Sequence, residues 1–189
     1  SLAVKLENKG KAVVYARVAA RGTPKPGSEN YRAEGLALSA GYQNASGKTV
    51  DPNQVATGDD IIVVLSVRNT SGGNLSDIAL TFRSPSGWEI SNMRVGRSGA
   101  DEADSEDSQF DYQDIRDDRV MTYFGLGTGE TKRFRIYVNK TYAGTYFLPA
   151  VTAEAMYKPD VFAVIPGREL SMAPVGRPAT TVNTRNLAP

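Results

Sequence analysis

The chain has 189 residues, of which 40% are hydrophobic and 23% are charged, a composition that supports one large folded domain or two very small ones. With 22 basic and 21 acidic residues the formal net charge is +1, which predicts no electrostatic attraction to nucleic acid or to an anionic membrane. The sequence contains no cysteine and no histidine, so disulfides, thiolate chemistry and histidine-based catalysis or metal binding are excluded.

Alternation of apolar and polar residues, the period of a half-buried β-strand, recurs along the chain. The expected strands, in chain order, are Ala12–Val18, Leu36–Tyr42, Ile61–Arg68, Ile78–Phe82, Val120–Phe124, Phe134–Val138, Thr145–Leu148 and Glu169–Met172. Ile61–Arg68 begins with apolar residues on both faces, which is typical of a strand in the centre of a sheet. Phe134–Val138 alternates with polar or amphipathic neighbours and predicts one face in solvent. The only helical segment we consider is a short one inside Val151–Met156.

Turn sequences such as Thr70–Asn74 and Ser84–Gly87 separate these strands. Many short strands, frequent turns and no sustained helical period predict an all-β fold, an antiparallel β-sandwich with two sheets around one core. We place this single domain at residues 1–172 and expect 173–189 to form a loosely ordered tail, since it has little to bury. The longest apolar runs, about five residues, are far shorter than the roughly 20 that a membrane-spanning helix needs.

The glycine-rich stretch Gly125–Gly129 superficially matches a phosphate-binding loop. Such a loop needs a helix N-terminus after it, because helical backbone N–H groups bind the anion. Here a predicted strand, Thr131–Val138, follows instead. The sequence therefore predicts a hairpin turn at this position.

Acidic residues gather between Gly99 and Asp118. The first group, Asp101–Asp107, offers oxygen ligands for calcium but lacks the ordered spacing and the glycine of a calcium loop, so a solvated acidic loop is the simpler interpretation. Whether 99–118 binds a cation stays open. The second group, Asp111–Asp118, is interleaved with Arg116 and Arg119, and this mixture favours ion pairing at the start of a strand.

Catalytic patterns are weak throughout. Paired carboxylates for glycoside hydrolysis do not stand apart from the general acidity, and no motif supports a Ser–Lys nucleophile, so we expect no enzymatic activity. Trp88 and Tyr112 are candidates for an exposed aromatic platform, which would suit a surface adhesin or a carbohydrate-binding module. For Trp88, the more frequent role is to anchor a loop in the end of the sandwich.

Several stretches carry a resemblance, and they keep their order from about Leu6 to Met172. They are Asn8–Gly10 before Val14–Arg17, Gly58–Asn69, Leu80–Arg83, Pro85–Ile90, Asp114–Arg119, Gly144–Pro149 and, as the most specific piece, Ala153–Pro159. Together they resemble the C-terminal, receptor-binding-like macroglobulin domain of bacterial alpha-2-macroglobulins. That resemblance implies an immunoglobulin-like sandwich of the macroglobulin type.

The resemblance also implies a longer parent protein, a bacterial protease inhibitor in the periplasm or anchored to the cell envelope. Such proteins are strings of sandwich domains with a protease-cleavable bait and a helical thioester domain, and bait cleavage releases the thioester to capture the protease. This chain lacks the cysteine that a thioester needs, so it represents one part of that machine. Its implied contacts are the thioester and macroglobulin domains of the same parent, and it meets the target protease only through the parent.

Met156 and Tyr157 match the positions at which the family's last domain helps to cover the thioester. A flexible thioether and an aromatic ring form an adaptable hydrophobic lid that keeps water and amines away from a reactive bond. The same two residues are equally compatible with ordinary packing at the end of a strand before Pro159. From its composition and charge we expect no cofactor, no metal ion and no nucleic acid for this domain.

Overall fold

A computed structural model describes residues 4–19, 22, 30–91 and 108–172 of the chain. Within these ranges the ordered body consists of β-strands and turns, with no helix. The strands are β1 (Arg32–Glu34), β2 (Leu36–Gln43), β3 (Asp60–Asn69), β4 (Leu75–Arg83), β5 (Trp88–Ile90), β6 (Tyr112–Ile115), β7 (Arg119–Leu126), β8 (Thr131–Lys140), β9 (Gly144–Leu148), β10 (Val151–Ala155), β11 (Phe162–Ile165) and β12 (Arg168–Met172). No helix able to cross a bilayer occurs in the part of the chain that the structure describes.

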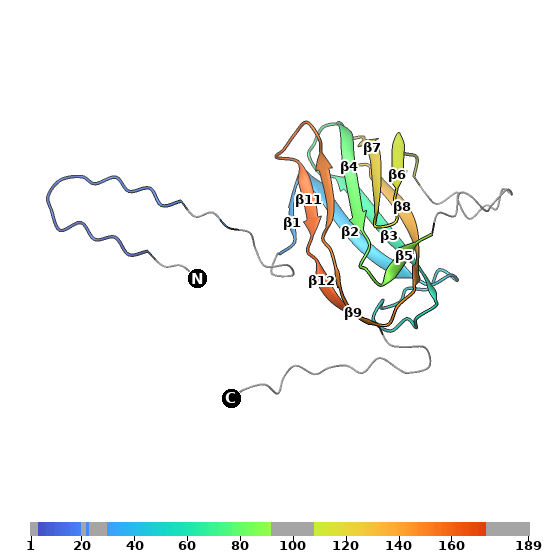
Figure 1. The fold of residues 1–189 in the computed structure, drawn as a ribbon. Coiled ribbons are helices and arrows are strands. Elements are labelled where there is room, and N and C mark those ends of the chain that lie inside the picture. Colours follow the sequence, from blue (N-terminus) through green and yellow to red (C-terminus); the bar gives the residue numbers. More distant parts are fainter. Residues whose placement is uncertain (1–3, 20–21, 23–29, 92–107, 173–189) are drawn as a thin grey trace, which may run out of the picture.

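The strands form two main sheets that pack face to face (Figure 1). One sheet has six strands in the order β1-β11-β10-β4-β7-β6, and the other has four in the order β2-β3-β8-β5. A two-stranded ribbon of β12 and β9 completes the fold. Every pair of named strands is antiparallel, which confirms the predicted antiparallel β-sandwich.

The core lies between the two main sheets and follows the alternation in the sequence. On β3, Ile61, Val63, Leu65 and Val67 are completely buried, and on β4 the same holds for Ile78 and Phe82 with Leu80 nearly so. Across the sandwich, the rings of Phe124 on β7 and Phe134 on β8 lie 4.7 Å apart. Burial of each such side chain contributes about 1.5–3 kcal/mol, so this interface is the main source of stability.

The central position predicted for the Ile61–Arg68 strand is confirmed. Strand β3 pairs with β2 on one side, from Leu36↔Asn69 to Gln43↔Ile62, and with β8 on the other, from Asp60↔Asn139 to Arg68↔Thr131. Both edges of its backbone are therefore hydrogen-bonded within the four-stranded sheet.

Two secondary-structure predictions are wrong. Residues 12–18 form no strand, because the described part of the chain supplies no neighbour with which their backbone pairs. The short helix considered inside Val151–Met156 is instead strand β10, which lies between β11 and β4. Its short apolar run fits a buried strand as well as a helical turn, and neighbours that are distant in the sequence decide between the two.

The predicted hairpin at Gly125–Gly129 is a turn of a different kind. It joins β7 to β8, and these strands belong to different sheets, so the chain crosses the sandwich here. The turn is closed by the Gly127 amide, which donates to a Glu130 carboxylate oxygen at 2.6 Å. The Glu130 amide in turn donates to the Gly127 carbonyl at 3.1 Å, and this compact turn carries no helix after it.

A second crossing occurs at Gly35, between β1 in the six-stranded sheet and β2 in the four-stranded sheet. Gly35 has φ of 69°, a left-handed conformation that glycine adopts without steric cost. A Cβ at this position would meet the Val161 side chain at 3.2 Å, so both the turn and the packing favour glycine. Residues 173–189 and the acidic group Asp101–Asp107 lie outside the described residues, so the domain limits and the tail stay predictions.

Candidate interdomain contact site

Met156 and Tyr157 lie in the loop between β10 and β11, at one end of the six-stranded sheet. The Met156 side chain is 52% exposed and the Tyr157 side chain is 79% exposed, so neither is packed in the domain's own core. Their neighbour on the strand, Ala155, is only 3% exposed. The end of a buried strand thus continues directly into a projecting apolar pair, which we call the Met156–Tyr157 tip.

Backbone hydrogen bonds close this loop. The Ala155 amide donates to the Val161 carbonyl at 3.0 Å, the Lys158 amide donates to the Ala155 carbonyl at 3.0 Å, and the Val161 amide donates to the Lys158 carbonyl at 2.8 Å. Pro159, whose φ is restricted by its ring, lies within the same turn. The backbone under the tip is therefore held by three short-range bonds, and only the side chains of Met156 and Tyr157 are free to adapt.

A β-bulge on β4 provides a further anchor for the tip. The pairing of β4 with β7 shifts register between Leu75 and Ile78, and Asp77 has φ of 56°, which is uncommon for a residue other than glycine. The bulge leaves the Asp77 carbonyl free to accept a hydrogen bond from the Met156 amide at 2.9 Å. This bond lies one residue beyond the last ladder pair, Ala155↔Ile78, and ties the tip to the sheet.

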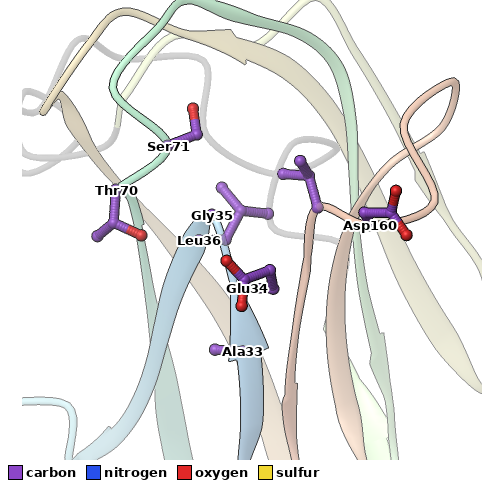
Figure 2. Close-up of a pocket in the computed structure, with 8 residues that line it drawn as sticks. Ala33, Glu34, Gly35, Leu36, Thr70, Ser71 and Asp160 are labelled. Carbon is purple, nitrogen blue, oxygen red and sulfur yellow. The ribbon is translucent and has the colours of Figure 1, made fainter.

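A hollow of about 480 Å³ lies at the base of the same loop (Figure 2). It is lined by Ala33, Glu34, Gly35, Leu36, Thr70, Ser71, Asp160 and Val161. These residues come from the β1–β2 crossing, from the loop after β3 and from the end of the β10–β11 loop, so the hollow forms where the two sheets meet. Its lining offers carboxylates and hydroxyls, and histidine and cysteine are absent from the whole sequence.

The aromatic residues considered for a carbohydrate platform have different positions. Trp88 is only 3% exposed and packs edge-on against Tyr42, with ring centroids 6.2 Å apart, so it anchors the loop end as the simpler interpretation predicts. Tyr112, on the edge strand β6, is exposed and stacks on Tyr123 at 5.9 Å. A platform would therefore have to depend on Tyr112 and exclude Trp88.

The predicted ion pairs of the second acidic group are confirmed at the turn between β6 and β7. Arg116 and Asp114 approach to 2.8 Å, and Arg119 contacts Asp118 at the same distance. The hydrogen bond from Arg119 holds the pKa of Asp118 below its usual value. Both pairs are exposed to solvent, where such pairs stabilise a fold very little. Across the described ranges, no group of three or more acidic side chains converges into a metal site.

The structure reveals two important residues that the sequence patterns did not predict, Lys140 and Asp77. Lys140 is completely buried, although the alternation that marks Phe134, Ile136 and Val138 as inward-facing continues in phase to it and was a usable signal. Asp77 gave no such signal, because a bulge depends on the register between two strands that are distant in the sequence.

Comparison with known proteins defines the class to which this sandwich belongs. The model of the bacterial alpha-2-macroglobulin MG10 domain matches residues 35–160, which is more than half of the chain. The chain therefore belongs to this family of macroglobulin domains. The match begins at the β1–β2 crossing and ends inside the loop that carries the Met156–Tyr157 tip.

Individual relatives agree with this assignment. An alpha-2-macroglobulin of Xylella fastidiosa (strain Temecula1) is 29% identical over 168 residues, covering 82% of this chain and 10% of the relative. Among solved structures, Salmonella alpha-2-macroglobulin reacted with methylamine has a TM-score of 0.66 at 21% identity, covering 77% of this chain and 10% of that one. Trypsin-activated alpha-2-macroglobulin from Escherichia coli has the same TM-score at 19% identity, covering 76% and 11%.

At these identities the solved structures establish the likeness of the fold. The chain spans about a tenth or less of the length of the curated relatives that it matches. The neighbours are domains within much longer chains, which is consistent with a domain that packs against others in the same polypeptide.

Proposed function

We propose that this chain is a non-catalytic, C-terminal domain of a bacterial alpha-2-macroglobulin-type protease inhibitor. In that parent, the Met156–Tyr157 tip packs against the thioester domain and shields the thioester from water and small amines until the bait is cleaved. The observation that carries the proposal is the exposure of a thioether and a phenol ring, 52% and 79%, on a loop that backbone hydrogen bonds hold in place.

The size of the contact suits a reversible shield. Burying side chains of this type contributes about 1.5–3 kcal/mol each, which is enough to favour a closed arrangement. It is also small enough for a conformational change in the parent to overcome. Because the loop backbone is already ordered, docking of the tip costs mainly the side-chain entropy of Met156 and Tyr157.

The comparisons support a link to amine and protease chemistry at the level of the family. The similar Salmonella protein was solved after reaction with methylamine, and the similar E. coli protein after activation by trypsin. This chain has no cysteine, so a thioester would have to lie in another domain of its parent.

By the same resemblance, the parent would reside in the periplasm or on the cell envelope. Fractionation of the source bacterium, followed by detection of this domain with an antibody, would test that location.

Substitution of Tyr157 in the full-length parent tests the shielding role. We expect Tyr157→Ala to accelerate methylamine incorporation about tenfold, because loss of ~1.5 kcal/mol of burial raises the open population by that factor. The measurement is the rate of thiol release from the intact parent on addition of methylamine. Lys158→Ala is the matched control, since Lys158 is exposed in the same loop but ends in a charged ammonium group that does not suit a hydrophobic contact.

The control should react at the rate of the unchanged parent. A parent that releases no thiol at all, or a Tyr157→Ala variant that reacts no faster than the Lys158→Ala variant, would contradict the shielding role. Membership of the macroglobulin family would stand in either case, because it does not depend on these two side chains.

A further inference from the structure

The hollow at the base of the β10–β11 loop carries two carboxylates that have no partner within the described part of the chain. Figure 2 shows Glu34 in the middle of the view, with Thr70 on one side and Asp160 on the other. Neither Glu34 nor Asp160 forms an ion pair or a side-chain hydrogen bond with another residue that the structure describes. The cations two positions away along the chain, Arg32 and Lys158, are not part of the lining. The charge of the hollow therefore favours a cation from elsewhere.

Ser71 adds a third hydrogen-bond acceptor to the lining. Its hydroxyl donates to the Asn69 side-chain oxygen at 2.8 Å or to the Gly73 carbonyl at 3.2 Å. A hydroxyl has one proton, so only the lone pairs of this oxygen are left for a ligand. Asn69 is buried, and its amide group also donates to the carbonyls of Gly73, at 2.7 Å, and Gly127, at 3.0 Å. This wall of the hollow is therefore held in place before any ligand arrives.

The remaining lining is apolar. Ala33, Leu36 and Val161 contribute hydrocarbon surface, and Leu36 belongs to the buried core. Glu34 and Asp160, in contrast, are exposed to solvent. Hydrocarbon surface at a buried residue, together with exposed carboxylates, suits a long side chain that has a methylene stem and a cationic end. Lysine and arginine are the two residues with that construction.

The hollow lies close enough to the Met156–Tyr157 tip for one partner to cover both. Asp160 is three residues beyond Tyr157, so at most about 11 Å of chain separates them. A protein–protein contact of ordinary size covers about 800 Å² of each partner, which is much wider than this separation. A domain that packs on the tip would thus also lie over the hollow.

We propose that a lysine or arginine of the thioester domain inserts into this hollow in the uncleaved parent and pairs with Glu34 and Asp160. The inference rests on the proposed function, since it assigns a second contact to the domain that the tip shields. Apolar contacts at the tip have little directionality, whereas a charged pair beside them fixes the orientation of the two domains. Loss of the pair should therefore loosen the shield even when Tyr157 is intact.

The rate of thiol release from the full-length parent on addition of methylamine tests the inference, with Tyr157→Ala measured in parallel. We expect Glu34→Gln to raise this rate about fivefold, the effect of losing one partly exposed ion pair, and Asp160→Asn to act in the same way. Glu34→Lys should raise it further, because it places like charges together. Glu89→Gln is the matched control, since it removes an exposed carboxylate from β5 in the other sheet and should leave the rate unchanged.

Hydrogen exchange in β3 and β8, equal in all variants, shows that each sandwich is folded. If Tyr157→Ala reacts faster but the Glu34 and Asp160 variants react no faster than Glu89→Gln, the hollow holds no cation and the shielding role stands. Acceleration of the unchanged parent by a chelator would assign the carboxylates to a divalent metal ion and overturn the inference. If Tyr157→Ala is no faster either, the shielding role fails, and the inference fails with it.

Discussion

The Lys140 ammonium lies completely buried beneath the loop that joins β2 to β3. It donates hydrogen bonds to the backbone carbonyls of Pro52, at 2.9 Å, and Val55. Burial lowers the pKa of Lys140 below its ordinary value, and the negative charges of Asp59 and Asp51 only partly oppose this effect. A single cation thus replaces water as the hydrogen-bond donor for carbonyls of an otherwise irregular loop.

Replacing Lys140 by methionine should destabilise the domain. Methionine fills a similar volume but leaves the carbonyls of Pro52 and Val55 without their donor, at a cost of about 1–3 kcal/mol. Urea unfolding of the 189-residue chain at pH 7, followed by tryptophan fluorescence, measures the difference. An equally stable variant would show that the loop supplies other donors.

The stability difference between wild type and Lys140→Met should also depend on pH. The unfolded state binds the lysine proton more tightly, since the pKa is lower in the folded state than the ordinary 10.5. Between the folded pKa and 10.5, the unfolded chain therefore carries more bound protons, and the stability of the wild type rises with pH. The variant lacks this contribution, so the gap should widen across that window. A constant or narrowing gap in urea titrations would contradict the assigned direction of the pKa.

At the scale of the element, the β10–β11 hairpin and the bulge on β4 act together. The bulge places Asp77 in a left-handed conformation, and its carbonyl then holds the Met156 amide. Asp77→Val should lower the free energy of unfolding by about 1–3 kcal/mol, because a β-branched residue adopts this conformation only under strain. Asp77→Gly, which tolerates the conformation, is the control and should retain wild-type stability or exceed it.

Urea denaturation measures these stabilities, and exchange of the Met156 amide reports on the tip itself. We expect that amide to exchange faster in Asp77→Val than in Asp77→Gly, since its acceptor moves with the bulge. Equal exchange rates in the two variants would mean that the local turn, and not the bulge, positions the tip.

The elements also show what alternation in a sequence can and cannot predict. The inward faces of β3 and β8 follow directly from it, because a strand has a period of two wherever one face is buried. The sheet to which each strand belongs does not follow from the alternation. The turn after Gly125 looks like a hairpin locally, yet the chain crosses between sheets there, and β10 resembles a helical turn until its neighbours are known.

In the candidate site, too, some features could be predicted from the sequence and others could not. Met156 and Tyr157 were accessible from the sequence through a family resemblance, whereas the bulge at Asp77 and the hollow beside Asp160 depend on contacts between distant segments. Residues 12–18 are the converse case. Their pattern predicts a strand that the structure does not contain, because a strand forms only where a neighbour completes its hydrogen bonds.

At the scale of the whole molecule, the domain is a sandwich with two exposed apolar features among the described residues, the Met156–Tyr157 tip and segment 4–19. Both offer apolar surface that the sandwich does not cover itself. The family to which the chain belongs, and the small share of its relatives' length that it spans, are consistent with a domain that packs against others in a longer chain. The central claim is that the tip contacts the thioester domain before bait cleavage and separates from it afterwards.

Photo-crosslinking from position 157 tests this claim most directly. A photoreactive phenylalanine analogue replaces Tyr157 in the full-length parent, which is irradiated before and after treatment with the protease, and the crosslinked peptides are identified by mass spectrometry. We expect a crosslink to the thioester domain in the uncleaved parent and its loss after cleavage. A crosslink confined to this domain, or one whose yield is the same in both states, would contradict it.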